Sequence, residues 1–170
     1  MKTRASTKKP LYSADERRRR DASPWTRVQA WLAPLQFVAF AVSLVLVVRY
    51  LYDAQGIRAA TFSVLVKTAL LYAIMITGSL WERDVFGKYL FARAFFWEDV
   101  VSMLVIALHT AYVIALLCDW LPARALMWLA LAAYASYAIN ASQFLVKFRA
   151  ARRRDLPPTQ RLALAAGTVK

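Results

Sequence analysis

Four long apolar stretches constrain the fold of this 170-residue chain more than any other feature. The first, residues 28–48, holds no charged side chain, and as a helix it would rise about 30 Å, the hydrocarbon thickness of a bilayer. Three more follow, over about 59–81, 98–118 and 125–146. Because 60% of the residues are hydrophobic and only 19% are charged, a water-soluble domain is excluded. The sequence predicts an all-α integral membrane four-helix bundle.

The positive charge is concentrated at the two ends of the chain. Residues 1–27 carry nine Lys or Arg and three Asp or Glu, and residues 147–170 carry seven and one. Basic segments beside membrane spans stay in the cytoplasm, and four crossings return a chain to its starting side. We therefore expect both termini in the cytoplasm, and we interpret the basic ends as topology signals rather than as a nucleic-acid-binding surface.

These patterns divide the chain into three parts. Residues 1–22 are expected to be a disordered basic tail, 23–150 a four-span membrane domain, and 151–170 a basic C-terminal tail. Within the membrane domain, residues 82–97 mix charged and aromatic side chains. Such a mixture is typical of a short interfacial helix or loop at the membrane surface.

The composition also excludes several kinds of chemistry. The four glycines are not clustered, so no phosphate-cradling loop or dinucleotide fingerprint is present. The single cysteine, Cys118, excludes an intrachain disulfide, a cysteine-based zinc site and an iron–sulfur cluster. The single histidine, His109, excludes a histidine-rich metal site. The chemistry must therefore come from carboxylates, amides, hydroxyls and one imidazole, and we expect no cofactor.

Six polar side chains lie in the apolar spans or at their edges. Each would cost a few kcal/mol if it faced lipid, so we expect all of them to face the bundle interior. Helix rise places Lys67 and His109 at similar depths, about 21 Å and about 18 Å from the cytoplasmic ends of their helices. The six are Lys67, Glu98, Asp99, His109, Asn140 and Gln143.

Each of these residues also has a structural interpretation. Lys67 could reach the membrane surface or bond a neighbouring helix, and His109 could form an interhelical hydrogen bond instead of ligating the magnesium of a chlorin. Glu98 and Asp99 could cap a helix N-terminus, where acidic groups are favoured. The two amides of the fourth span could serve helix packing alone.

Eight short blocks, among them Phe-Phe-Trp-Glu-Asp at 95–99, resemble the 3-vinyl bacteriochlorophyllide hydratases of phototrophic bacteria. The resemblance covers roughly residues 14–152. It implies a multi-pass enzyme of the bacterial cytoplasmic membrane that hydrates the C3-vinyl group of a (bacterio)chlorophyllide to a 3-(1-hydroxyethyl) group. It also implies lipid, this pigment and other bacteriochlorophyll-synthesis enzymes as partners. The blocks are Arg17–Trp25, Leu32–Phe37, Lys67–Tyr72, Thr77–Glu82, Phe86–Phe91, Phe95–Ser102, Leu108–Tyr112 and Tyr137–Phe144.

Hydration of such a vinyl group needs a proton donor, a positioned water and a base, but no redox cofactor. A carboxyl group at the edge of an apolar pocket can keep its proton near neutral pH, because desolvation disfavours the anion. Our hypothesis makes Glu98 or Asp99 the acid, with the other of the two or Glu82 orienting the water. His109 would ligate the pigment magnesium or deliver the proton.

The remaining predicted site residues would bind the substrate. Lys88 or Arg93 would pair with its free propionate. Phe95, Phe96 and Trp97 would stack on its ring. Three polar side chains within the spans complete the predicted set: Lys67, Asn140 and Gln143.

Two other classes of protein fit the same pattern without the resemblance. A non-catalytic pigment-binding or assembly subunit of a photosynthetic complex would also be a small helical protein with one intramembrane histidine. It would retain pigment whose vinyl group stays intact. A small transporter is disfavoured, because the chain shows neither duplicated halves nor a pair of broken helices.

Overall fold

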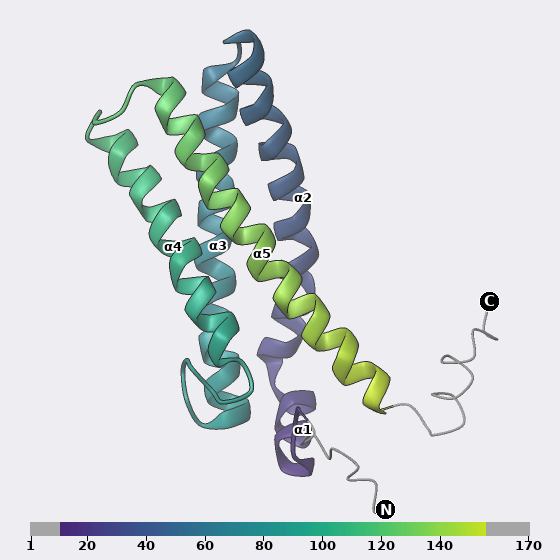
Figure 1. Ribbon diagram of the computed structural model, residues 1–170. Helices are drawn as coiled ribbons and strands as arrows, with labels where there is room; N and C mark the ends of the chain where they lie inside the picture. Colours follow the sequence, from purple (N-terminus) through teal and green to yellow (C-terminus); the bar gives the residue numbers. More distant parts are fainter. Residues whose placement is uncertain (1–10, 156–170) are drawn as a thin grey trace, which may run out of the picture.

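The structure, a computed structural model, describes residues 11–155, and every regular element in that range is helical (Figure 1). Four of the helices are long and apolar enough, by length and composition, to cross a membrane, which confirms the prediction of an all-helical chain with four candidate spans. The helices are α1 (Ala14–Ala22), α2 (Pro24–Asp53), α3 (Ile57–Phe86), α4 (Phe96–Leu117) and α5 (Ala123–Asp155).

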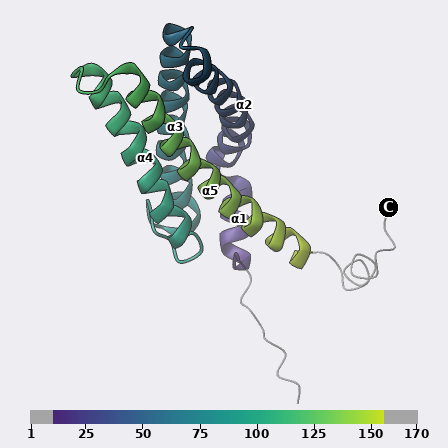
Figure 2. The ribbon, with the colours of Figure 1, turned by 45° about the horizontal axis from the view of Figure 1, so that its top comes forward.

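The four long helices form two antiparallel hairpins, α2–α3 and α4–α5. The first hairpin turns through Ala54 and Gly56, both in the left-handed region at φ 56° and 78°, and the second turns beside Asp119 at φ 53°. Figures 1 and 2 show α5 crossing the bundle obliquely, from its start beside α4 toward the end of the bundle where α1 lies. The contacts within each hairpin are much denser than those between the hairpins.

A buried core joins the two hairpins at the end of the bundle away from α1. Val47 of α2, Val64 of α3, Tyr112 of α4 and Met127 of α5 are all fully buried there. Ser43 of the first hairpin also hydrogen-bonds Tyr134 of the second at this level. This core fixes one end of the bundle, so that the other end can contain open space.

The prediction of a disordered tail over residues 1–22 is wrong for residues 14–22, which form α1. The Ser13 hydroxyl accepts from the Glu16 amide at 3.2 Å, and the Glu16 carboxylate accepts from the Ser13 amide at 2.7 Å. This capping box satisfies two exposed amide donors, and acidic residues in the first turn and basic residues in the last complement the helix dipole. The Arg19 guanidinium then donates to the Val85 carbonyl at 2.8 Å, which docks α1 against α3. Residues 1–10 lie outside the described part.

The other predicted boundaries shift by a few residues. Helix α3 continues to Phe86, so only residues 87–95 of the predicted interfacial segment 82–97 form a loop. Helix α5 continues to Asp155, past the predicted start of the C-terminal tail at 151, and residues 156–170 lie outside the described part.

The end of α3 depends on a glycine. Gly87 has φ +75°, and its amide donates to the Arg83 carbonyl at 2.9 Å, closing the last turn. Gly87→Ala should lower the free energy of unfolding by about 1 kcal/mol, because a Cβ strains the left-handed conformation although no atom lies within 4 Å of it. Thermal unfolding in detergent measures this effect. Gly78→Ala is the control, since its Cβ would meet ordinary contacts at 3.8 Å; equal stability of the two variants would contradict the prediction.

Candidate active site

A cavity of about 730 Å³ lies between the two hairpins at the end where α1 docks, and we call it the central cavity. Its volume falls in the range of small-molecule and cofactor sites, and most of its wall is apolar. All five helices and the loop before α4 contribute to it. Its polar and ionisable lining residues are Tyr12, Arg20, Thr26, Gln29, Gln36, Ser79, Glu82, Asp99, Ser102, Tyr137, Asn140 and Arg152.

Two carboxyl groups meet in the wall of the central cavity. Glu82 at the end of α3 and Asp99 at the start of α4 are 5% and 3% exposed, and the two side chains lie close enough for each carboxyl group to act on the other. Two carboxylates buried this close together would repel each other, which favours a state in which the two groups share one proton. We call Glu82 and Asp99 the carboxyl pair.

The loop between α3 and α4 holds the carboxyl pair in place. The Phe91 amide donates to Asp99 Oδ2 at 2.7 Å, and the Ala92 amide donates to Glu82 Oε2 at 3.2 Å. Phe91 has φ 59°, a left-handed conformation that non-glycine residues rarely adopt. Backbone strain therefore occurs at the residue whose amide positions a carboxylate of the pair.

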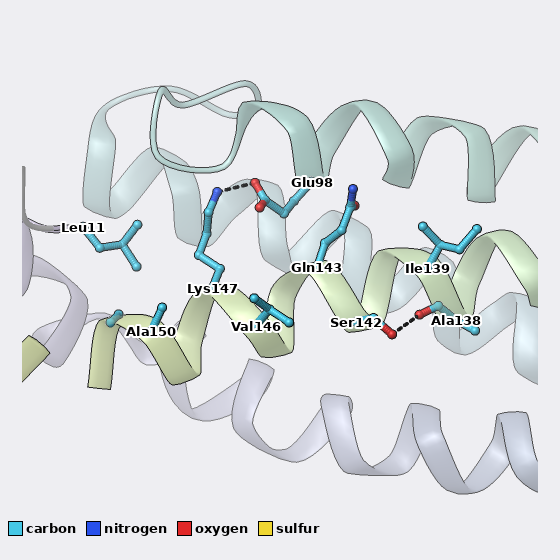
Figure 3. Close-up of a pocket in the computed structure, with 10 residues that line it drawn as sticks. Leu11, Glu98, Ala138, Ile139, Ser142, Gln143, Val146, Lys147 and Ala150 are labelled. Carbon is cyan, nitrogen blue, oxygen red and sulfur yellow. Dashed lines mark hydrogen bonds and ion pairs between the residues drawn. The ribbon is translucent and has the colours of Figure 1, made fainter. Parts of the chain in front are cut away.

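Glu98 points away from the carboxyl pair, so of the two arrangements that the sequence left open, Asp99 with Glu98 or Asp99 with Glu82, the structure brings together the second. Consecutive helical residues point about 100° apart, and Glu98 accordingly faces α5. It forms an ion pair with Lys147, which also donates to the Ala94 carbonyl. Figure 3 shows this pair in a second cavity of about 800 Å³, a groove bordered by the exposed side chains Ile139 and Val146.

Only one of the three predicted stacking aromatics lines the central cavity. Phe95 is 1% exposed and packs edge-on against Trp81 and Phe86, with ring centroids 5.7 and 5.9 Å away. Phe96 and Trp97, which follow it at the start of α4, are exposed and contribute nothing to the cavity wall. Phe95 is therefore the aromatic residue of this segment that can contact a ligand there.

The basic side chains that line the central cavity are not the two that the sequence analysis named. Lys88 and Arg93 are exposed on the loop and line neither cavity. Arg20 of α1 and Arg152 of α5 line the central cavity instead. The sequence analysis missed both because it treated the two basic ends as tails that only set topology.

Lys67 and His109 are fully buried but do not line the central cavity. The Lys67 ammonium lies 3.8 Å from the centre of the Tyr137 ring, and the His109 ring lies 5.9 Å from that of Tyr134, one turn away on α5. Helix rise predicted similar depths for Lys67 and His109, and their contacts with rings one turn apart on α5 agree with that prediction. Nδ1 of His109 bonds the Val105 carbonyl at 2.8 Å, so the imidazole ties successive turns of α4.

The two amide side chains of α5, Asn140 and Gln143, line different cavities. Asn140 lines the central cavity, and its Nδ2 donates to the Glu98 carbonyl and to Ser102 Oγ, both at 2.9 Å. It therefore joins α5 to α4 and also faces the cavity. Gln143 lines the groove beside Glu98.

Gln36 is a cavity residue that the sequence analysis did not single out. It is 1% exposed, and neither polar atom of its amide has a hydrogen-bond partner among the described residues. An unpaired buried polar group costs about 1–3 kcal/mol, so this amide is suited to bond a ligand or a water in the cavity. The signal was present, because Gln36 is a polar residue in the middle of the first apolar stretch.

The fold and the site define a class: a helical protein with four helices that could span a membrane, a largely apolar cavity between them and a carboxyl pair in the cavity wall. The comparisons with known proteins agree with this class. The family model described as 2-vinyl bacteriochlorophyllide hydratase (BCHF) matches residues 12–150. The chain therefore belongs to the 2-vinyl bacteriochlorophyllide hydratase family.

Two relatives named 2-vinyl bacteriochlorophyllide hydratase are similar along most of their length. The protein of Rhodobacter capsulatus is 64% identical over 146 residues, which cover 86% of this chain and 85% of the relative. The protein of Cereibacter sphaeroides is 59% identical over 148 residues, covering 87% and 92%. No solved structure matches the chain.

Proposed function

We propose that this protein is a membrane hydratase of bacteriochlorophyll biosynthesis, which adds water across the vinyl group of a (bacterio)chlorophyllide to give the hydroxyethyl pigment. The observation that carries the proposal is the carboxyl pair in the wall of an otherwise apolar cavity. The relatives' names place the vinyl group at position 2 and the resemblance places it at position 3. Two ring-numbering systems assign these numbers to the same substituent.

The carboxyl pair can supply both proton transfers of the reaction. Its acid member gives a proton to the terminal vinyl carbon, whose π electrons form the new C–H bond. The positive charge left on the inner carbon is delocalised into the macrocycle. A water oxygen then bonds to that carbon, and the carboxylate member takes a proton from the water. The product has gained one H and one OH, and the pair again holds one proton.

The chain's other cavity residues would bind and orient the macrocycle. Phe95 is part of the apolar wall that a flat aromatic ligand would contact, and this wall excludes bulk water from the cation. Leu71 and Glu82, which both line the cavity, are eleven residues apart on α3, which corresponds to about 16 Å of depth. The proposal needs no cofactor, since hydration is redox-neutral and the magnesium is part of the substrate.

The proposal includes the orientation of the protein in the membrane. We place the two basic ends of the chain, α1 and the end of α5, at the cytoplasmic face of a bacterial inner membrane. The carboxyl pair then lies near that face, where water and protons are available. An arrangement beside other enzymes of bacteriochlorophyll synthesis is also part of the proposal.

Product analysis tests the proposed function directly. Membranes containing the protein should convert vinyl-chlorophyllide to a pigment heavier by one water, and the product should carry label when the reaction is run in water enriched in heavy oxygen. Membranes from cells with an empty vector are the control. Co-purification of pigment whose vinyl group stays intact would instead identify a pigment-binding subunit.

A further inference from the structure

Two arginine residues line the central cavity. Arg20 comes from α1 and Arg152 from α5, so the two cations approach the cavity from different elements. The carboxyl pair comes from two other helices, α3 and α4. The cavity wall therefore has basic side chains on one pair of helices and the carboxyl pair on another.

Arg20 is held in a defined position. Its guanidinium carbon lies 4.9 Å from the centre of the Tyr12 ring, and Tyr12 in turn stacks on Phe86 at 5.9 Å. The Thr26 hydroxyl donates to the Arg20 carbonyl at 2.5 Å, which fixes the backbone at the end of α1. Burial raises the pKa of Tyr12 to about 12 although Arg20 opposes the shift, so the phenol stays neutral beneath the cation.

The guanidinium of Arg20 keeps donors for a second anion. Its side chain is 29% exposed, and its ion pair with Asp21 uses a single carboxylate oxygen, Oδ1, at 2.7 and 2.8 Å. An arginine side chain has five N–H donors in a planar fork, which suits a two-point contact with a carboxylate. Asp21 itself is 61% exposed and is absent from the cavity lining.

We propose that Arg20 and Arg152 bind the free propionate of the pigment, and that they make the protein selective for the free acid over esterified pigment. This inference rests on the proposed function. The propionate and the vinyl group are borne by different rings of the macrocycle, so a carboxylate held at these cations orients the ring within the cavity. A charged contact beside an apolar cavity wall is worth more than one in open water, because its surroundings screen it less.

Binding of the free acid and of its methyl ester tests the inference without any turnover. Pigment binding to the purified protein in detergent is followed by the shift of the pigment absorption band. The wild type should bind the free acid at least tenfold more tightly than the methyl ester. Arg20→Gln and Arg152→Gln should each weaken binding of the acid several-fold while leaving the ester unchanged, and the double variant should remove the preference.

Arg18→Gln is the matched control, because Arg18 lies on the same helix, is 81% exposed and does not line the cavity. It should leave both affinities unchanged. A preference that survives in the double variant, or an equal loss for acid and ester, overturns the inference. Hydration without any preference for the acid would refute this inference alone, whereas an arginine-dependent preference without hydration would refute only the proposed function.

Discussion

Asp99→Asn should lower the rate of vinyl hydration by two to four orders of magnitude while changing pigment affinity by less than about threefold. Positioned general acids and bases contribute roughly 10²–10⁴-fold, and an amide cannot exchange the proton that the carboxyl pair shares. The asparagine oxygen can still accept from the Phe91 amide, so the loop should keep its conformation. Glu82→Gln should have an effect of the same order, because the two carboxyls work as a unit.

Two further carboxylates serve as controls for this experiment. Asp84→Asn removes a carboxylate that accepts a hydrogen bond from the Ser23 hydroxyl at 2.7 Å and lines neither cavity. Glu98→Gln removes the acid that pairs with Lys147. Both variants should hydrate within a few-fold of the wild-type rate, measured by product formation under single-turnover conditions. Normal turnover in Asp99→Asn, or loss of turnover in Glu98→Gln alone, would contradict the assignment.

Lys147→Met should lower the free energy of unfolding by about 3 kcal/mol, the second largest effect that we expect. The Glu98 side chain is only 8% exposed, and removing Lys147 leaves its carboxylate without a counter-ion between α4 and α5. Breaking one side of a buried ion pair is costly, whereas replacing both sides by neutral groups is often close to neutral. Thermal unfolding in detergent measures the change.

The double variant Lys147→Met with Glu98→Gln distinguishes two causes of such a loss of stability, an uncompensated charge on Glu98 and lost packing of the Lys147 side chain. It should recover most of the stability, because no uncompensated charge remains. Arg149→Met, an exposed cation two residues away, should change stability little. If the double variant is as unstable as Lys147→Met, the loss comes from side-chain packing of Lys147, such as its contact 5.0 Å from the Phe95 ring centre, and not from charge.

The sequence was sufficient to predict the four candidate spans because apolar length is a local property of the chain. Four of its candidate site residues, Glu82, Phe95, Asp99 and Asn140, line the central cavity. Three of them are ionisable or polar groups in apolar surroundings, which are costly in lipid and therefore face inward. In contrast, the pairing of Asp99 with Glu82 depends on how α3 and α4 meet. Residue spacing within one helix carries no information about that contact.

The basic residues that line the central cavity could not be predicted for a similar reason. Lys88 and Arg93 lie close to the aromatic segment in the sequence, but they are exposed on the loop. Arg20 lies far from that segment in the sequence and reaches the cavity only because α1 folds back against α3. A signal was nevertheless available, since Ser13 followed by Glu16 is a capping-box pattern that predicts a helix start.

The way the two hairpins are joined has a mechanical consequence. Ser43 and Tyr134 bond the hairpins at one end, whereas the loop 87–95 and the carboxyl pair join α3 to α4 at the other. The α2–α5 side of the cavity is therefore where the hairpins can separate without breaking these contacts. An apolar pigment could then exchange laterally between the cavity and the surrounding lipid. Neither substrate nor product would need to dissolve in bulk water.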